Sequence, residues 1–198
     1  MLELAILGLL KDQPMHGYQL KKSLESTMGA AWQPSFGSVY PALRRLERTG
    51  SVEKVVVEER TPRRGRRGAE RPDRTKRRKV YRITDVGESA FRDLLETDEG
   101  GNEERTFSLK LAFCRYMPPE ERVVLFERRR AHLTERLAHL RSSIKTAMRD
   151  AKERMDTYTL SLMRHGLDST ESDIRWLDDL IEAERAMARP LTHKGETS

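Results

Sequence analysis

Residues 35–50 of this chain read SFGSVYPALRRLERTG, and the fold of the first half depends on what this stretch forms. Its apolar residues recur at helical spacing and predict one buried stripe, made of Val39, Leu43 and Leu46. Proline is tolerated only in the first turn of a helix, so Pro41 places the helix start near residue 37 or 38. Gly50 is expected to end the helix. The stretch therefore predicts a short helix with one buried side and one exposed side.

The exposed side of this helix carries Tyr40, Arg44 and Arg48, which are spaced four residues apart. Small residues stand at its start: Ser35, Gly37 and Ser38. Either serine can cap the first turn, and small side chains let backbone N–H groups come close to a phosphate. An exposed arginine pair on a helix is by itself more often a solvated face than a binding site. The neighbouring segments decide between these two interpretations.

The order of the surrounding segments is that of a winged helix-turn-helix. Two apolar helices are predicted before the stretch, at residues 2–10 and 15–28. The first is apolar nearly all round, so its own domain or a second subunit should bury it. Two β-branched, strand-like segments follow at 51–59 and 79–84. A fourth helix comes next, with Asp85 and Glu88 spaced as in a capping box.

The loop between the two strand-like segments, residues 60–79, carries the positive charge of the chain. It holds eleven Lys and Arg against two acidic residues, a surplus of nine, whereas the whole chain has a net charge of +6. The other residues therefore carry a net charge of −3. A basic run alone is more often a tail, but one bracketed by strands predicts a DNA-binding wing. We expect DNA contacts from six of its arginines: Arg63, Arg64, Arg66, Arg67, Arg77 and Arg78.

The helix at 35–50 is the predicted reader of double-stranded DNA. A helix fits the major groove of B-DNA, where the edges of the base pairs can be distinguished. We expect Arg44 to contact guanine or phosphate and Tyr40 to reach phosphate or a base edge, although Tyr40 has packing as its alternative. Tyr18, in the preceding helix, is a candidate phosphate contact. Two other functions stay open: a non-specific architectural nucleic-acid-binding protein driven by the arginine-rich loop, and a protein-interaction module.

The second half of the chain is predicted to be helical. A linker at 97–106 leads to a short apolar helix and then to a long helix with an approximate heptad rhythm up to Leu162. Gly166 is expected to interrupt this helix before a last helix at 170–188. The seam of the long helix is predicted to pair two subunits through Leu133, Leu137, Leu140, Ile144, Ala151 and Met155. The alternative is an antiparallel hairpin with the last helix, and the two arrangements are compatible.

The predicted protein is thus mainly α-helical and has two domains. Residues 1–96 form a winged helix-turn-helix DNA-binding domain with a two-stranded β-wing, whose basic part is 60–79. Residues 107–189 form a coiled-coil-like dimerisation domain, and 190–198 form a disordered tail. A two-fold dimer presents two recognition helices, so it predicts a pseudo-palindromic operator with half-sites about one helical turn apart or a multiple of it.

Several classes of function are excluded by what the sequence lacks. The single cysteine, Cys114, permits neither a disulfide framework nor a cysteine-based zinc site, which favours a reducing cytoplasm. The N-terminus has no basic segment or cleavage site of a signal peptide, and no apolar run is long enough to span a membrane. The five histidines form no recognisable metal site, and no catalytic or cofactor-binding motif is present. We expect no enzyme activity, cofactor or metal. An unidentified small-molecule effector stays open, with Trp32 and Trp176 as candidate stacking residues.

Four segments of the sequence resemble the PadR family of transcriptional regulators: LAILGLL, HGYQL, FGSVYPALRRLERTG and RRKVYRITDVGE. The likeness covers about residues 1–95, and the segment at 109–122 is similar to the start of the helical C-terminal region of that family. The resemblance implies a homodimeric repressor whose winged helices bind a palindromic operator and whose C-terminal helices pair the subunits. The chain departs from the family in its wing, which is longer and far richer in arginine.

Overall fold

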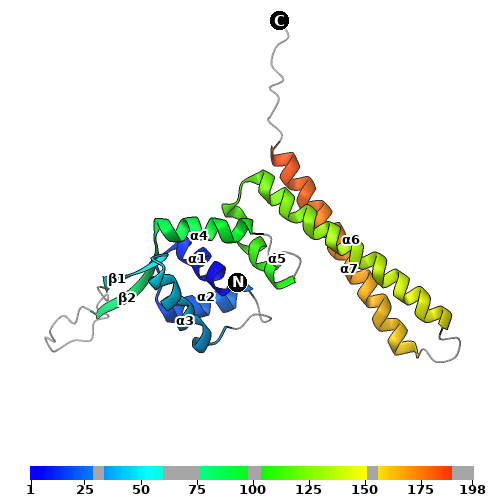
Figure 1. Cartoon of the computed structure of the whole chain (residues 1–198), viewed down its shortest axis with the longest axis horizontal. Helices are drawn as coiled ribbons and strands as arrows, with labels where there is room; N and C mark the ends of the chain where they lie inside the picture. The colour runs from blue at the N-terminus through cyan, green and yellow to red at the C-terminus, as the bar shows by residue number, and fades with distance from the viewer. Residues whose placement is uncertain (29–33, 60–75, 98–103, 151–155, 189–198) are drawn as a thin grey trace, which may run out of the picture. The chain divides into compact units, whose positions relative to one another are not determined.

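The computed structural model describes residues 1–28, 34–59, 76–97, 104–150 and 156–188 of the 198 (Figure 1). Its first elements are helices α1 (Leu2–Asp12), α2 (Gly17–Met28) and α3 (Phe36–Arg48), strands β1 (Val52–Glu59) and β2 (Lys76–Ile83), and helix α4 (Asp85–Glu96). The remaining elements are α5 (Glu104–Ala112), a 3₁₀ turn at Cys114–Tyr116, α6 (Pro119–Asp150) and α7 (Thr157–Ala188). Two compact units result. The N-terminal unit is Met1–Thr97 with Ser108–Phe113, and the C-terminal unit is Asp98–Phe107 with Cys114–Ser198.

The N-terminal unit is a winged helix-turn-helix, which confirms the predicted fold. Helix α1 lies at its centre, because residues 4–10 are all buried within this one unit rather than by a second subunit. Phe113 closes the core over Gly8, where an added Cβ would lie 2.5 Å from the Phe113 ring. Phe113 also meets Phe91 of α4 edge to face, with 5.9 Å between the ring centroids. The end of α5 therefore belongs to the core of the N-terminal unit.

Helix α2 begins two residues later than predicted. The helix begins at Gly17, because Met15 pairs with Tyr81 as an isolated bridge on the outer edge of β2. The Met15 N–H donates to the Tyr81 carbonyl at 3.0 Å, and the Tyr81 N–H donates to the Met15 carbonyl at 2.8 Å. A ring nitrogen of His16, Nδ1, lies 2.8 Å from the Lys79 carbonyl. The base of the wing is thus bound to the polypeptide on both of its sides.

Helix α3 ends at Gly50 as predicted, through a Schellman motif. The Ser51 N–H donates to the Leu46 carbonyl at 2.9 Å, and the Gly50 N–H donates to the Glu47 carbonyl at 3.1 Å. Gly50 has a φ of 73°, which a residue without a Cβ adopts at little cost. The helix starts earlier than predicted, at Phe36, so Pro41 lies in its second turn. The helix tolerates this proline with the loss of one intrahelical hydrogen bond.

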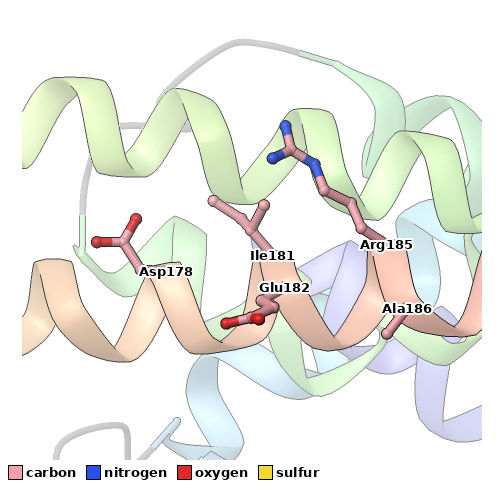
Figure 2. A pocket seen from close by; sticks show the side chains of 5 residues that line it. All are labelled: Asp178, Ile181, Glu182, Arg185 and Ala186. Atoms are coloured by element: carbon pink, nitrogen blue, oxygen red, sulfur yellow. The ribbon is translucent and has the colours of Figure 1, made fainter.

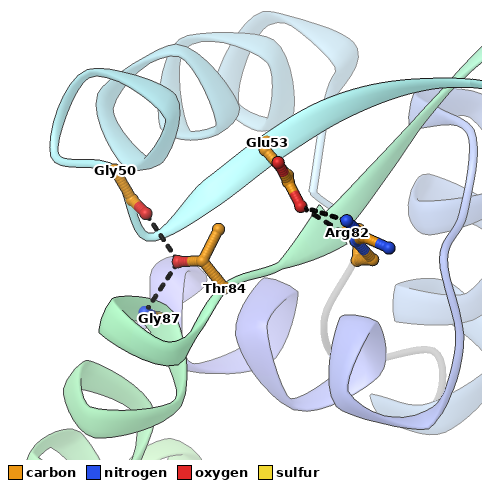
Figure 3. A network of polar contacts seen from close by, with 5 residues as sticks. All are labelled: Gly50, Glu53, Arg82, Thr84 and Gly87. Carbon is orange, nitrogen blue, oxygen red and sulfur yellow. Dashed lines mark hydrogen bonds and ion pairs between the residues drawn. The ribbon is translucent and has the colours of Figure 1, made fainter.

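The turn after α3 is joined to the first turn of α4 (Figure 3). The Thr84 hydroxyl donates to the Gly50 carbonyl at 2.6 Å and accepts the Gly87 N–H at 3.2 Å. Thr84 therefore caps α4, and the predicted capping box at residues 85 and 88 is wrong: both lie inside the first turn, where their charges favour the helix N-terminus. An added Cβ at Gly87 would lie 2.0 Å from the Ser51 carbonyl oxygen. This junction fixes the direction in which the wing leaves α3.

The wing is an antiparallel ribbon in which Val52 pairs with Ile83 and Glu59 with Lys76. Near its base, Glu53 and Arg82 form an ion pair at 2.6 Å across the strands (Figure 3). Opposite charges on facing positions favour this register over a slipped one. The predicted wing residues Arg63, Arg64, Arg66 and Arg67 lie outside the described residues.

In the C-terminal unit, α6 and α7 pair as an antiparallel hairpin (Figure 1). Four ion pairs join the helices, and partners near the end of α6 lie near the start of α7, as antiparallel packing requires. The pairs are Arg122–Glu184, Glu127–Arg185, Arg130–Asp178 and Arg141–Glu171. The core between them includes Phe126, Leu133, Leu137, Leu177 and Ile181. The antiparallel hairpin with the last helix, the alternative given in the sequence analysis, is therefore present within the chain.

The predicted continuous helix up to Leu162 is wrong. Helix α6 ends at Asp150 and a new helix, α7, begins at Thr157 and runs through Gly166 without interruption. Asp156 starts α7, because its carboxylate accepts the Tyr158 N–H at 2.8 Å and the Thr159 N–H at 2.9 Å. A glycine inside a helix costs only about 1 kcal/mol, which packing on α6 offsets.

The expected linker at 97–106 is shorter than predicted, because α5 already begins at Glu104. Lys110 of α5 is buried and donates through Nζ to the Thr97 carbonyl at the end of α4. Residues 98–103 and the expected tail at 190–198 lie outside the described part of the chain. None of the described helices is long and apolar enough to cross a membrane.

Candidate nucleic-acid interface

The outer side of α3 presents a stripe of exposed residues that ends in two arginines: Gly37, Pro41, Arg44 and Arg48. The opposite side anchors the helix through four buried residues: Val39, Ala42, Leu43 and Leu46. Arg44 and Arg48 make no hydrogen bond or ion pair with any residue that the structure describes. Arg45, which points to the side, donates to Glu3 at 2.9 Å. The stripe is therefore cationic and has no internal counter-charge.

The acidic residue next to this stripe is already neutralised. Glu47 accepts the Lys54 ammonium from β1 at 2.6 Å. This hydrogen bond raises the pKa of Lys54 above its usual value, and the Lys54 ammonium lies 5.6 Å from the centre of the Tyr81 ring. Because Glu47 is paired with Lys54, its charge is not available to Arg44, and the positive potential of α3 is preserved.

The first turn of α3 offers backbone donors. Ser35 is the N-cap residue, but its side chain makes no capping hydrogen bond. The Ser38 hydroxyl instead donates to the Ser35 carbonyl at 2.8 Å. The N–H groups of Phe36 and Gly37 consequently have no acceptor within the described residues. Free N–H groups at a helix N-terminus form a site that favours an anion such as a phosphate.

Three exposed aromatic rings stand in a row beside this helix start. Phe36 lies between Tyr18 of α2 and Tyr40 of α3, with 6.1 Å between centroids on each side and interplanar angles of 20° and 22°. The Lys21 ammonium lies 4.9 Å from the centre of the Phe36 ring. Our prediction named the two tyrosines and missed Phe36. The signal was its position four residues before Tyr40, which puts both rings on one side of α3.

Tyr40 packs against α2 and is also partly exposed, so packing describes part of its environment, and its contact with DNA stays a prediction. Its ring lies against the start of α2: an added Cβ at Gly17 would be 2.9 Å from the ring and 3.0 Å from the hydroxyl oxygen. The helix-turn-helix angle thus depends on a glycine that leaves space for the ring. Tyr40 as a whole is 39% exposed.

Comparison with known proteins gives matches in both halves of the chain. Residues 6–68 match the model of the transcriptional regulator PadR-like family, and residues 105–184 match a family described as virulence activator alpha C-term. The negative transcriptional regulator PadR of Bacillus subtilis is 24% identical over 187 residues, which are 91% of this chain and 95% of that protein. The chain is thus similar to the PadR-like family of transcriptional regulators over residues 6–68 and to one PadR protein over most of its length.

Solved structures of transcriptional regulators are also similar to this chain. The crystal structure of Bacillus subtilis PadR with operator DNA is 22% identical, with 92% of this chain and 98% of that chain covered and a TM-score of 0.37. The structure of the same protein with p-coumaric acid is 21% identical, covers 93% and 98%, and has a TM-score of 0.35. A transcriptional regulator from Clostridium thermocellum is 25% identical over 46% of this chain and 75% of its own, with a TM-score of 0.37.

Several residues of the PadR-like motif have structural roles in this chain. Gly50, Thr84 and Gly87 form the junction between α3, the wing and α4 described above. In the wing, Arg77 lies opposite Glu58 in the register, whereas Arg78 lies opposite Val57. The backbone places both arginines in β2, between the base of the wing and the basic loop.

The residues predicted to pair two subunits occupy different environments. Leu133 and Leu137 are buried within their own chain, on the unit that α6 and α7 form. Leu140 and Ile144 are half-buried, and Ala151 and Met155 lie outside the described residues. Half of the described seam is thus already covered by the hairpin.

The remaining candidates from the sequence are the two tryptophans and the single cysteine. Trp32 lies outside the described residues, and Trp176 meets Phe107 edge to face at 6.2 Å. Burial raises the pKa of the Cys114 thiol, which disfavours its reactive thiolate form. Among the described residues, no group of three His, Cys, Asp or Glu side chains could hold a metal ion. A groove of about 350 Å³ on α7 is lined by Asp178, Ile181, Glu182, Arg185 and Ala186 (Figure 2).

Proposed function

We propose that this protein is a PadR-like homodimeric repressor that binds a pseudo-palindromic operator through α3 and the wing. The observation that carries the proposal is the cationic stripe of α3, where Arg44 and Arg48 have no counter-charge among the described residues. Exposed arginines without partners beside open helix N–H groups suit a polyanion such as DNA. A protein of this kind would act in the cytoplasm and would need no enzyme activity.

In this proposal each part of the surface has a separate task. Helix α3 enters the major groove, where Arg44 donates to guanine O6 and N7 or to a phosphate. The helix start at Ser35, Gly37 and Ser38 approaches a phosphate, with Tyr18 and Tyr40 on the same strand of the duplex backbone. The wing arginines, including Arg77 and Arg78, follow the backbone or enter the adjacent minor groove.

The homodimer and the effector complete the proposal. Two copies related by a two-fold axis would read two half-sites about one helical turn apart or a multiple of it. Bacillus subtilis PadR has been crystallised in complex with p-coumaric acid. We propose that this chain also responds to a small molecule, whose identity its residues do not specify.

The alternative function is a non-specific architectural nucleic-acid-binding protein. It is favoured by the surplus of nine positive charges in the loop at 60–79. A protein that binds through this loop would depend on the wing arginines and would distinguish sequences poorly. A specific repressor would depend on Arg44 and Tyr40 for discrimination.

The test is fluorescence anisotropy with DNA from upstream of the protein's own gene and with a scrambled duplex, each at two salt concentrations. Arg44→Ala should reduce the preference for the native duplex by about 1–3 kcal/mol, because a base contact is lost. Arg45→Ala is the matched control, since Arg45 is engaged with Glu3 on the side of the same helix. Equal loss on both duplexes would favour the architectural alternative.

The wing is tested in the same assay. Replacing Arg77 and Arg78 by alanine should weaken binding to both duplexes and lower the salt dependence by about 0.9 log unit for each lost phosphate contact. A salt dependence that stays at the wild-type value would exclude the wing from the interface. A native duplex that binds at least about 10³-fold tighter than the scrambled one supports the specific repressor.

A further inference from the structure

Phe36, the first residue of α3, is an apolar ring left at the surface of the N-terminal unit. It is 42% exposed, whereas each of the other four phenylalanines of the chain is at most 3% exposed. Tyr18 and Tyr40 beside it are exposed as well. A cluster of three exposed aromatic rings is a surface that a partner is expected to cover. Phe36 is therefore available for contact.

The Phe36 ring is held in position by its neighbours. Tyr18 and Tyr40 lie next to it, with 6.1 Å between the ring centroids in each pair. The Lys21 ammonium lies 4.9 Å from the centre of the ring and is itself paired with Glu25. A side chain that is already ordered loses little conformational entropy when it binds. The ring is thus preorganised for a contact at the surface.

The backbone next to this ring is open. Gly37 has no side chain, and an added Cβ there would meet only the Ser35 Oγ, at 3.4 Å. The N–H groups of Phe36 and Gly37 have no acceptor among the described residues, so a phosphate can bind to them. In the proposed complex this phosphate belongs to one strand of the operator. Because the first residues of a recognition helix contact base edges, the Phe36 ring would then lie beside a base in the major groove.

Among the groups that base pairs present in the major groove, one is apolar. Guanine, cytosine and adenine present hydrogen-bond donors and acceptors there, and thymine presents an acceptor and its 5-methyl group. A phenylalanine ring can satisfy none of the polar groups, and covering one of them would remove its hydrogen bond to water. The 5-methyl group of thymine is the group that the ring can cover with a gain in free energy.

We propose that Phe36 contacts the 5-methyl group of a thymine in each half-site of the operator, and that this contact selects thymine at that position. The inference rests on the proposed function, because it requires α3 to lie in the major groove. Phe36 lies about 12 Å before Arg44 along the helix, at 1.5 Å per residue, so the two side chains contact different base pairs. Burial of one methyl group corresponds to about a fourfold change in affinity, and two half-sites correspond to about fifteenfold.

The first test compares thymine with deoxyuridine, whose base lacks only the 5-methyl group. The native duplex is prepared with thymidine and again with deoxyuridine at every thymine, and fluorescence anisotropy measures the dissociation constants of wild type and Phe36→Ala for both. Wild type should bind the deoxyuridine duplex about fifteenfold more weakly, and Phe36→Ala should lose most of this difference. Duplexes with a single deoxyuridine in each half-site then locate the thymine.

Two further variants separate a base contact from a structural effect. Phe36→Leu keeps an apolar side chain and should keep part of the preference for thymine, whereas Val86→Ala, at an exposed apolar position of α4, should keep all of it. A wild type that prefers the native to the scrambled duplex but binds thymine and deoxyuridine duplexes alike would overturn this inference and leave the proposed function standing. Phe36→Ala with the full wild-type difference would also overturn it, because another residue would then contact the methyl group. A wild type that binds native and scrambled duplexes alike would contradict both.

Discussion

The N-terminal unit and the α6–α7 hairpin are held together in opposite ways. In the N-terminal unit, single residues at the end of α3 and the start of α4 have tasks that few other residue types could perform there: Gly50, Thr84 and Gly87. In the hairpin, stability is spread over a repeated apolar stripe and a row of ion pairs. A fold of the first kind should fail at single positions, whereas one of the second kind should lose stability in increments.

Two glycines show the difference between the two units most directly. Gly87 lies where α4 approaches the turn after α3, and its missing side chain leaves only enough space for the backbone. Gly166 lies within α7, and an added Cβ there would meet nothing within 4 Å. The space around each glycine should therefore decide whether its substitution by alanine raises or lowers the free energy of unfolding.

Gly87→Ala should give the largest loss of stability. The new Cβ would lie 2.0 Å from the Ser51 carbonyl oxygen, so α4 or the turn must move. We expect a cost of about 3 kcal/mol or more in the free energy of unfolding, because neither partner is a flexible side chain. Urea unfolding followed by circular dichroism measures this cost.

The control for this prediction is specific DNA binding, which Gly87→Ala should lose together with the fold of its unit. The hairpin should keep its structure, as reported by Trp176 fluorescence in a Trp32→Phe background. Wild-type stability in Gly87→Ala would show that the junction between α3 and α4 is not as close as described.

Leu133→Ala should cost less, about 2–3 kcal/mol in the free energy of unfolding, because it opens a cavity in the hairpin core. Leu162→Ala is its matched control at an exposed position of α7, and it should change the free energy of unfolding by less than about 0.5 kcal/mol. Leu133 is buried and Leu162 is 72% exposed, although both belong to the same predicted seam. If the two substitutions lowered the free energy of unfolding equally, Leu133 and Leu162 would be equally buried, as the prediction of one continuous seam implies.

The sequence predicted the N-terminal unit well because its signals are local. Gly50 marks a helix end, β-branched residues mark the two strands, and the charged loop separates them. The Met15–Tyr81 bridge and the contact of Phe113 with Gly8 could not be predicted, since each joins residues far apart in the sequence. Phe36 was missed for a similar reason, because its role as the middle ring depends on how α2 and α3 cross.

The sequence predicted the hairpin less well because a heptad rhythm does not name its partner. Positions spaced by three and four residues continue from Leu133 to Leu162 whether the helix is continuous or broken. The decisive feature was Asp156, a helix-capping residue inside an otherwise helical pattern. Gly166 drew attention as a helix breaker, although its cost inside a packed helix is small.

Gly166→Ala should raise stability by about 0.5–1 kcal/mol, the difference in helix propensity between the two residues. The Thr170 hydroxyl donates to the Gly166 carbonyl at 2.8 Å, and this bond does not depend on the side chain at 166. Thermal unfolding of the hairpin, followed through Trp176 in the Trp32→Phe background, measures the gain. A loss of stability would mean that another surface, such as a second copy, approaches the helix at Gly166.

Asp156→Asn should have the smallest effect, and this effect should depend on pH. The N–H and the hydroxyl of Thr159 and the N–H of Tyr158 donate hydrogen bonds to the carboxylate and lower the pKa of Asp156 below its usual value. A lowered pKa means that the ionised carboxylate stabilises the fold, fully above the unfolded-state value of about 4 and progressively less as the pH falls through the folded-state value. Wild type should therefore melt above Asp156→Asn at pH 7, and the two melting temperatures should converge as the solution is acidified. A difference that stayed constant down to about pH 2 would assign the effect of Asp156 to something other than its charge, because asparagine keeps the capping oxygen.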